Sequence, residues 1–600
     1  MAEFERHSYD VVVIGAGGAG LRAAIAAHDA GARTAIICKS LLGKAHTVMA
    51  EGGAAAAMGN LWPDDSWRVH FRDTMRGGKM LNNWRMAQLH AQEAPERVLE
   101  LEEWGALFDR TPDGLISQRD FGGHRYARLA HVGDRTGLEM IRTLQQRAVA
   151  LGIDVFMECT VTEVLTDDGA VAGAFGYWRE SGRFIVFETP SIVLATGGIG
   201  KVYEVTSNSW EYTGDGHALG LRAGAPLINM EFVQFHPTGM VWPPSVRGIL
   251  VTESVRGDGG VLKNSEGERF MFNYIPDFFK AETADTEEEA DGWYDDKKNN
   301  RRPPELLPRD EVARAINSEI KAGRGSPHGG VFLDIASRRS PEFIQRRLPS
   351  MYHQFKELAD VDITAEPMEI GPTCHYVMGG VEVDADTGAS AVTGLYAAGE
   401  VSGGMHGSNR LGGNSLSDLL VFGRRAGLNA AYYAGRLSES RPQVSERDVT
   451  AAGKAALAPF SDAGRVDENP YTLQKDLQAT MQRLVGIIRT REELTQALVE
   501  LETLKERAKH IQVEGHRQYN PGWHLALDLA NMLLVAECVA TAALEREESR
   551  GGHTRDDFPL PSEDWGSKNL VLTEKDGVVS LKHQPLQTMP GELQQLFEEE

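Results

Sequence analysis

A short apolar run followed by three spaced glycines constrains the fold of this chain more than any other feature. Residues 11–14 are all apolar, Gly15, Gly17 and Gly20 follow in G-x-G-x-x-G order, and an alanine-rich stretch comes next. In such a strand, turn and helix the glycines let the backbone approach a pyrophosphate, and the first amide groups of the helix face the anion. The segment therefore predicts a dinucleotide site in a Rossmann-like domain.

The ribose-binding position does not follow the pattern of an NAD site. A second predicted strand, residues 34–38, ends at Lys39 and Ser40. An NAD site has an aspartate or glutamate about 20 residues after the glycines, where it binds the ribose. This difference counts against a plain NAD site and leaves the nucleotide open at this point.

The length and net charge of the chain indicate how many domains to expect and which partners to exclude. The chain has 600 residues, which exceeds what one hydrophobic core supports, so we expect about two to four domains. The formal net charge is −24, from 86 acidic and 62 basic residues, and 42% of the residues are hydrophobic. Because no basic excess is available to neutralise phosphates, the composition argues against a nucleic-acid partner. We expect a soluble globular protein.

Hydropathy and the cysteine pattern bear on membrane spans, targeting peptides and metal sites. No uninterrupted apolar run reaches about 18 residues, and the first residues are polar and acidic, so we predict no direct membrane span and no signal or transit peptide. The four cysteines lie far apart without a C-x-x-C pair, which fits a reducing compartment and excludes a self-contained iron–sulfur or zinc site. We predict no metal ligand here, and any metal centre would belong to a partner.

The loop after the second strand is rich in small residues and contains His46 and Thr47, followed by Gly52 and Gly53. It is too glycine-rich for a core and too apolar for a solvated linker, so we expect its backbone to lie against a ligand. A histidine in such a loop is more often a hydrogen-bonded structural residue than a reactive one. The position of His46 beside the glycine-rich turn favours the reactive interpretation.

With this loop and the motifs that follow, nearly the entire chain resembles the flavoprotein subunits of succinate dehydrogenases and fumarate reductases. In that family, a histidine at the position of His46 carries FAD through a covalent bond to the 8α position. The family usually has serine before this histidine and glutamine before the two glycines, whereas this chain has Ala45 and Glu51. The Lys39-Ser40 ending of the second strand also resembles the family, so FAD replaces NAD as the expected cofactor.

Further motifs predict how FAD is held. Residues 191–195 form a buried strand by pattern and end in an A-T-G-G turn, Asp215 lies in a T-G-D-G turn, and a strand at 393–397 leads to Glu400. A helix starting near residue 414 would aim its amide groups and dipole at the flavin. The resemblance implies cofactor contacts at Gly15, Gly17, Gly18, Gly20, Lys39, Ser40, His46, Thr47, Gly52, Gly53, Thr196, Gly197, Gly198, Asp215, Glu400, Ser415 and Leu416.

Polar residues between 231 and 260 predict the reacting site. They stand among apolar and glycine neighbours, where burial is costly unless ligands or partners satisfy them. The resemblance assigns Arg309 to proton transfer with Glu253 and Arg256 as its relay, while hydride passes between a substrate carbon and flavin N5. It assigns dicarboxylate binding to Phe121, His236, Thr252, His375 and Arg410.

The predicted fold class is α/β, with a discontinuous Rossmann-like FAD-binding domain, an α+β capping domain, a C-terminal helical bundle and a small C-terminal domain. Helical periodicity at 473–487, 492–511 and 523–548 predicts the bundle. Residues 277–308 carry an acidic run and then a basic one, so we expect a mobile surface loop, either a plain insertion or a partner-docking segment. The predicted ranges are 1–241 and 357–440 for the FAD-binding domain, 242–356 for the cap, 441–550 for the bundle and 551–600 for the last domain.

The resemblance implies succinate oxidation to fumarate, an iron–sulfur subunit, membrane-anchor subunits and a peripheral place on the cytoplasmic face of a bacterial plasma membrane. A fumarate reductase would share every one of these residues. An L-aspartate oxidase shares the architecture but binds FAD non-covalently, which the His46-Thr47 pair disfavours. A tRNA-modifying FAD protein needs a basic surface, and a non-enzymatic scaffold would not need the histidines and arginines between 236 and 410.

Overall fold

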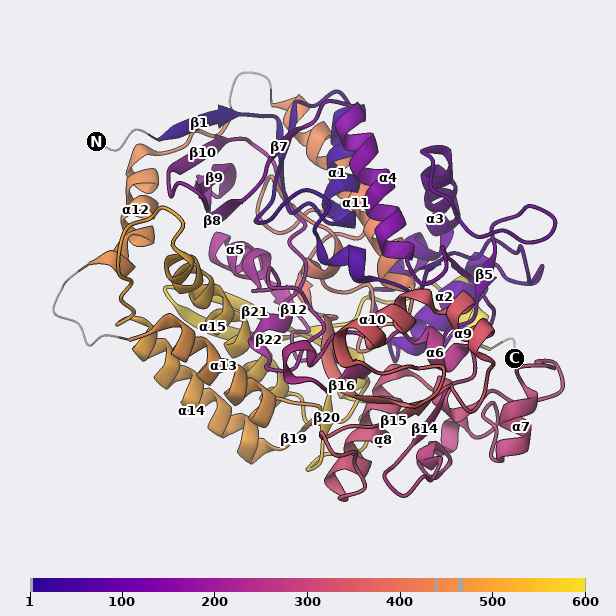
Figure 1. Cartoon of the computed structure of the whole chain (residues 1–600). Coiled ribbons are helices and arrows are strands. Elements are labelled where there is room, and N and C mark those ends of the chain that lie inside the picture. Colours follow the sequence, from indigo (N-terminus) through magenta and orange to yellow (C-terminus); the bar gives the residue numbers. More distant parts are fainter. Residues whose placement is uncertain (1–3, 438–440, 462–467, 599–600) are drawn as a thin grey trace.

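A five-stranded parallel sheet carries the glycine-rich turn (Figure 1). This computed structural model describes residues 4–437, 441–461 and 468–598. The strands of the sheet, in spatial order, are β18 (Leu395–Ala397), β11 (Ile192–Leu194), β2 (Val11–Ile14), β3 (Thr34–Ile37) and β7 (Asp154–Phe156). The central strands are buried on both faces, which explains why they are apolar, except for Thr34, rather than alternating. The sheet therefore joins segments that lie far apart in the sequence.

Two helices cross closely behind the sheet, α1 (Gly18–Asp29) and α11 (Asn414–Arg436). A Cβ atom at Gly427 would lie 2.1 Å from the carbonyl oxygen of Ala23, and one at Gly423 would lie 2.7 Å from that of Ala19. The glycines of α11 thus permit backbone contact with α1. This contact fixes the amino-terminal end of α11 next to that of α1.

A second, mixed sheet of four strands adjoins this region, with one parallel and two antiparallel pairings. Strand β9 (Ala170–Trp178) pairs antiparallel with β10 (Phe184–Glu188) to form a hairpin. Strands β8 (Cys159–Asp167) and β1 (Glu5–Ser8) complete that sheet. The surrounding helices are α2 (Trp67–Gly77), α3 (Trp84–Glu103), α4 (Thr136–Ala150), α5 (Asp215–Ala223) and α12 (Glu446–Ala456).

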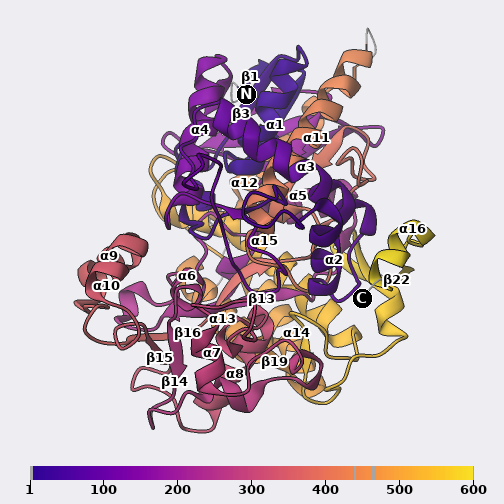
Figure 2. The ribbon, with the colours of Figure 1, turned by 90° about the vertical axis from the view of Figure 1, so that its right-hand side faces the viewer.

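A second hydrophobic core, formed by residues between Met240 and Ile370, lies at the other end of the molecule in both views (Figures 1 and 2). Its sheet has the order β13 (Val233–Met240), β16 (Met368–Val377), β15 (Val331–Asp334) and β14 (Val261–Lys263). Its helices are α6 (Ser254–Gly257), α8 (Arg309–Lys321), α9 (Pro341–Arg347) and α10 (Pro349–Ala359). Strand β13 enters this core from the sheet region, which places residues 231–260 between the two bodies.

Residues 277–308 hold more secondary structure than the loop we expected, and the mobility of the segment stays a prediction. The segment contains α7 (Glu287–Gly292), and Trp293 is buried. The acidic and basic runs neutralise each other, because the Arg301 guanidinium lies 2.9 Å from Asp285 and 2.7 Å from Glu289. Complementary charge and one buried indole therefore fold a segment that its composition suggested was solvated.

Three helices follow as predicted: α13 (Pro470–Leu484), α14 (Arg491–Ala508) and α15 (Pro521–Glu545). Among the described helices, only α15 is long and apolar enough to cross a membrane, and 67% of its most apolar window is buried inside the protein, as in a core helix. The chain ends in a hairpin, β21 (Lys568–Lys575) and β22 (Val578–Pro585), which extends a sheet with β12 (Leu227–Ile228) and β17 (Gly380–Val381). The predicted boundary at residue 440, the start of the first predicted range at residue 1 and the end of the last at residue 600 lie outside the described residues.

Candidate active site

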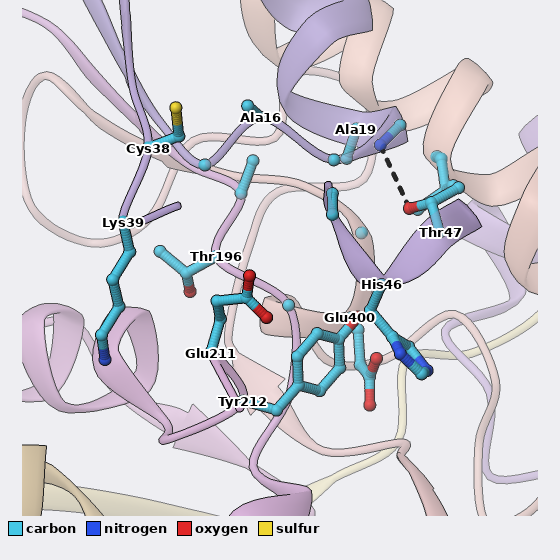
Figure 3. Close-up of a pocket in the computed structure, with 18 of the residues that line it drawn as sticks. Ala16, Ala19, Cys38, Lys39, His46, Thr47, Thr196, Glu211, Tyr212 and Glu400 are labelled. Atoms are coloured by element: carbon cyan, nitrogen blue, oxygen red, sulfur yellow. Dashed lines mark hydrogen bonds between the residues drawn. The ribbon is translucent and has the colours of Figure 1, made fainter. Parts of the chain in front are cut away.

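One cavity runs between the amino-terminal ends of α1 and α11 (Figure 3). Most of the predicted cofactor residues line it: Gly15, Gly17, Gly18, Lys39, Ser40, His46, Thr47, Thr196, Gly197, Asp215, Glu400, Ser415 and Leu416. His375 and Arg410, which we predicted as substrate ligands, line the same cavity. The predicted cofactor and substrate residues therefore adjoin.

Four predicted cofactor glycines are not among the described residues that line the cavity: Gly20, Gly52, Gly53 and Gly198. A Cβ atom at Gly20 would lie 1.9 Å from the carbonyl oxygen of Gly15, so only glycine lets α1 pack there. A Cβ at Gly52 would lie 2.4 Å from the ring of Phe121, and one at Gly198 would lie 2.2 Å from Oε1 of Glu400. These glycines allow the segments behind the cavity lining to pack closely, and they do not line the cavity themselves.

The turn after β2 fits a pyrophosphate. Gly15 has a φ of +116°, and a Cβ atom there would lie 2.1 Å from the carbonyl oxygen of Ala195, so no other residue fits. The amide of Gly18 donates to Oγ1 of Thr47 over 3.3 Å, which ties the turn to the His46 loop (Figure 3). The start of α1 therefore presents backbone amides and its positive dipole end to the cavity, which suits a bound phosphate.

Lys39 is held by two carboxylates at one end of the cavity. Its Nζ lies 2.9 Å from Asp215 and 2.7 Å from Asp528, which comes from α15. Burial alone would lower the pKa of Lys39, but these two carboxylates outweigh it and raise the pKa, so the amine stays charged. We did not predict Asp528 from the sequence, because the periodicity of its helix indicated only a packing role in the bundle.

His46 places a neutral imidazole in the cavity wall. Burial, followed by the nearby charge of Lys201, lowers its pKa to about 4, so the imidazole is neutral near pH 7. Its Nε2 lies 3.3 Å from the side-chain amide of Asn208, and within the described part of the chain its buried Nδ1 has no hydrogen-bond partner. The ring of Tyr212 meets it edge-on with centroids 4.8 Å apart (Figure 3). Asn208 and Tyr212 were not predicted, since neither lies in a recognisable motif.

Glu400 lies beside Tyr212 and His46 in the cavity wall (Figure 3). One carboxylate oxygen accepts from the Val377 amide over 3.1 Å, and Tyr212 is a further hydrogen-bond partner. Burial nevertheless dominates and raises the pKa of Glu400 to about 8. The side chain is thus protonated and neutral at pH 7.

The raised pKa of Glu400 predicts a specific dependence of stability on pH. The unfolded carboxyl ionises near 4.5 and the folded one near 8, so unfolding releases a proton between these values and stability falls as pH rises through that window. Glu400→Gln should remove this part of the fall and raise the melting temperature at pH 8.5 relative to the natural protein. Melting curves of both proteins from pH 5 to 8.5 measure it, and parallel curves would contradict the assignment.

The predicted proton relay forms one buried cluster. The Glu253 carboxylate lies 2.9 Å from Nε of Arg309 and 3.9 Å from Nη2 of Arg256, and it accepts from the Gly122 amide over 2.8 Å. Burial would raise the pKa of Glu253, but Arg309 and then Arg256 outweigh it and lower the pKa, so the carboxylate is ionised. Two guanidiniums facing one carboxylate leave a positive excess. Among the described atoms, Nη1 of Arg309 is buried without a partner and is available to an anion.

The predicted substrate ligands adjoin this cluster. The rings of His236 and His375 lie 5.1 Å apart, and burial, followed by the neighbouring charges, lowers the pKa of both well below the usual value, so both are neutral. Arg410 donates to Ser415 over 2.8 Å and to Gln234 over 3.1 Å. Gln234 was missed because a glutamine inside a strand carries no signal of its own.

Two further predicted positions complete the pocket. Phe121 is 3% exposed, with its ring against Gly52 and Gly412. Thr252 is buried and its hydroxyl donates to Ser254 over 3.2 Å, while burial, followed by the charge of Asp134, raises the pKa of the neighbouring Glu51 well above its usual value. Glu51 therefore supplies a neutral carboxylic acid beside Thr252. From the sequence, Glu51 was notable only because the family usually has glutamine at this position.

A dinucleotide cavity that meets a pocket of arginines and neutral histidines defines an oxidoreductase acting on a small anion. The sequence matches the family described as "FAD binding domain" over residues 10–416 and that described as "Fumarate reductase flavoprotein C-term" over residues 474–595. The chain thus belongs to the flavoprotein subunits of succinate dehydrogenases and fumarate reductases, and the predicted resemblance and the FAD cofactor are confirmed. Its architecture is the mixed α/β flavoprotein fold of that family.

Three similar proteins illustrate the match. The "Fumarate reductase flavoprotein subunit" of Mycobacterium tuberculosis is 38% identical over 96% of this chain and 97% of its own length. The "Succinate dehydrogenase flavoprotein subunit" of Rickettsia conorii is 36% identical over 97% of this chain and 95% of its own length. A chain of the structure of Mycobacterium smegmatis Sdh1 in complex with UQ1 is 63% identical, with a TM-score of 0.87 over 99% of this chain and 97% of that chain.

Proposed function

We propose that this chain is the flavoprotein subunit of a succinate:quinone oxidoreductase that oxidises succinate to fumarate. The observation that carries the proposal is the Glu253 carboxylate between Arg309 and Arg256, next to Arg410 and two neutral histidines. This pocket has more positive than negative charge and lies beside the cofactor cavity. A dicarboxylate dianion supplies the missing negative charge and accepts hydrogen bonds from the guanidiniums.

Each side chain has a role in the proposal. Arg410 binds one carboxylate of the substrate, while Phe121, His236, Thr252 and His375 position the rest. Arg309 takes the proton from the substrate carbon, and Glu253 with Arg256 passes it onward. When bound, FAD supplies the acceptor for the hydride that leaves the neighbouring carbon. We propose that His46 carries FAD covalently, because its imidazole is neutral and lies in the cavity wall.

We propose the domain scheme on the same basis. Residues 1–241 and 357–440 form the FAD-binding domain, in accord with a parallel sheet whose edge strand is β18. Residues 242–356 form the cap, supported by the second core, which extends to Ile370. Residues 441–550 form the helical domain. Residues 551–600 form the last one, although Leu570 and Leu572 of its hairpin join the main core.

A succinate–dye reduction assay with malonate as inhibitor tests the reaction. The purified flavoprotein should reduce an artificial acceptor with succinate, and malonate should compete with succinate. Absence of turnover in a preparation that retains its flavin would refute the proposal. L-aspartate in place of succinate tests the L-aspartate oxidase alternative in the same assay.

The reverse direction is the second candidate, because the 38% identical relative is named a fumarate reductase. The same side chains serve both directions, since proton and hydride transfer are reversible. The reduction potential of the flavin and the electron partner decide between them. Comparing fumarate reduction with succinate oxidation in one preparation, each with its own dye, measures the preference.

We propose that the partners of this chain are membrane-anchor subunits together with an iron–sulfur subunit, which would place it peripherally on the cytoplasmic face of the plasma membrane. The four cysteines are buried thiols, and among the described residues no group of three or more metal-ligating side chains could hold a metal ion. We therefore assign any metal centres on the path to a quinone to a second protein. The similar Sdh1 structure is named as a complex with UQ1.

The partner proposal predicts how the native protein fractionates. After gentle lysis, we expect it to sediment with membranes and to co-purify with iron in detergent. Succinate should then reduce a quinone as well as a dye. Recovery as soluble, iron-free protein would contradict the quinone-linked assignment and favour a soluble reductase.

A further inference from the structure

Arg256 is held at both ends by the segment 277–308. Its guanidinium is fully buried, and Nη1 donates to the backbone carbonyl of Glu305. Nε and Nη2 have no hydrogen-bond partner among the described atoms, and Nη2 lies 3.9 Å from Glu253. The backbone carbonyl of Arg256 accepts from the Tyr294 hydroxyl over 2.8 Å. The Glu305 carbonyl therefore sets the direction in which the Arg256 guanidinium points.

Glu305 is itself held by a buried ion pair. Its carboxylate is fully buried and accepts from Arg269 twice, over 2.6 Å from Nε and over 2.9 Å from Nη2. Arg269 is also buried, and its Nη1 donates to Asp291 on α7 over 3.0 Å. Two parallel hydrogen bonds between a guanidinium and a carboxylate fix orientation as well as distance. The side chain of Glu305 is therefore fixed in one orientation.

The chain that follows Glu305 contacts the rest of the proposed relay. Arg309, the first residue of α8, lies four positions after Glu305. A Cβ atom at Gly122 would lie 3.0 Å from the carbonyl oxygen of Leu306, so the two backbones are in close contact. The amide of Gly122 is the group that donates to Glu253. A shift of the backbone at Glu305 would therefore be transmitted to every member of the relay.

The burial of Arg269 and Glu305 is not explained by stability alone. Taking two charges out of water costs several kcal/mol for each ion, and their mutual attraction offsets this cost only in part. Replacing such a pair with apolar side chains of similar volume is often neutral or stabilising. The contact between the Glu305 carbonyl and Arg256 offers a second reason for the pair, because it fixes the geometry of the relay.

We propose that Arg269 and Glu305 are positioning residues for proton transfer, which hold Arg256 in line with Glu253 and Arg309. The inference rests on the proposed function and adds two residues to its relay. Neither residue is among the described ones that line the cofactor cavity, so both act through Arg256. A proton crosses a hydrogen bond only over a short distance, and a displacement of about 1 Å can cost up to about a hundredfold in rate.

Arg269→Met with Glu305→Leu tests the proposal. This variant removes both charges together, and Asp291 keeps Arg338 as a partner, so no new unpaired charge is buried. We expect kcat for succinate oxidation to fall about tenfold. The malonate inhibition constant and the flavin content should stay near the natural values, because the substrate ligands are unchanged. Arg269→Lys keeps the charge without the fork, so it should show the same split to a smaller degree.

A matched control separates the relay from the general packing of the second core. Arg324 also pairs through two nitrogens with a buried glutamate, over 2.8 and 2.7 Å, and this glutamate, Glu319, lies on α8 like Arg309. Arg324→Lys makes the same change as Arg269→Lys. It should keep nearly the natural kcat, because Arg324 does not contact the relay.

A double-mutant cycle shows whether the pair acts through Arg256. Arg256→Lys alone should slow turnover, because lysine lacks the planar guanidinium that faces both Glu305 and Glu253. Adding Arg269→Met with Glu305→Leu should then slow turnover little further, since the side chain that the pair positions is already changed. Two effects that multiply in full would mean that the pair acts elsewhere, and would overturn the proposal.

The remaining outcomes are separable. A natural kcat in Arg269→Met with Glu305→Leu would overturn the positioning role and leave the proposed function intact. So would a loss of flavin or of malonate affinity in proportion to kcat in both Arg269 variants, since that result would assign the pair to stability. A natural kcat in Arg256→Lys would remove Arg256 from the proposed proton route, and an absence of succinate turnover in the natural holoprotein would overturn the proposed function itself.

Discussion

Arg309→Lys should abolish most turnover while leaving much of the dicarboxylate affinity. Lysine keeps a positive charge at the first residue of α8, so an anion is still attracted. Arg309 contacts Glu253 through Nε while its Nη1 remains available to the substrate. Lysine has no such planar, forked group and cannot make both contacts at once. Removal of a general acid–base group costs on the order of a hundredfold or more in rate.

The physical reason lies in how a guanidinium becomes a base. Free guanidinium has a pKa above 12 and is a poor base in water, so proton transfer through Arg309 needs a neighbour that shares the proton. Glu253 lies between Arg309 and Arg256, and its pKa is lowered because these two charges outweigh burial. An ionised carboxylate in that place can take a proton onward while the cluster stays charge-compensated.

Steady-state succinate oxidation and malonate inhibition should be measured on the same variant. Arg314→Lys is a suitable control, because Arg314 is on the same helix but pairs with Glu311, and it should turn over nearly normally. If malonate affinity falls in proportion to rate, Arg309 only binds substrate. If turnover is normal, Arg309 has no part in the reaction.

His46→Ala should bind FAD but release all of it on acid precipitation, whereas the natural protein retains yellow flavin in the pellet. The turn at Gly15 and the start of α1 remain in the variant and continue to bind the pyrophosphate. Only the proposed covalent link should be lost. Succinate oxidation should also fall, because we expect the covalent link to raise the reduction potential of the flavin.

A second buried histidine provides the control for this experiment. Burial also lowers the pKa of His217 to about 4, and this residue lies on α5 outside the described cavity lining. His217→Asn should keep its flavin through acid treatment. Flavin that stays with His46→Ala in acid would place the attachment at another residue, and flavin lost from both variants would point to a general loss of folding.

The sequence predicted best the features that local patterns encode. The three helices of the predicted bundle form as α13, α14 and α15, and the glycine turn forms the cavity wall as expected. Both depend on residues that are close in the chain. The sequence could not reveal Asp528, Tyr212 or Gln234, because each reaches the site from an element whose own pattern is that of scaffold, turn or strand.

The error at residues 277–308 has a similar physical origin. Separate acidic and basic runs are each typical of solvated chain, and the interpretation treated them one at a time. In the fold, Arg301 folds back on Asp285 and Glu289, so the charges compensate each other within the segment. Trp293 was the available sign, since an indole in a solvated loop would be costly to leave exposed.

The contact between Lys39 and Asp528 bears on the order in which a newly made chain becomes able to hold its cofactor. Strand β18 joins the sheet from residues 395–397, and Asp528 reaches Lys39 from a helix synthesised later still. A nascent chain that has emerged only to residue 416 contains the whole first family match, yet Lys39 has Asp215 as its single carboxylate. Tight cofactor loading should therefore follow translation rather than accompany it, and the unfinished polypeptide would depend on chaperones until α15 docks.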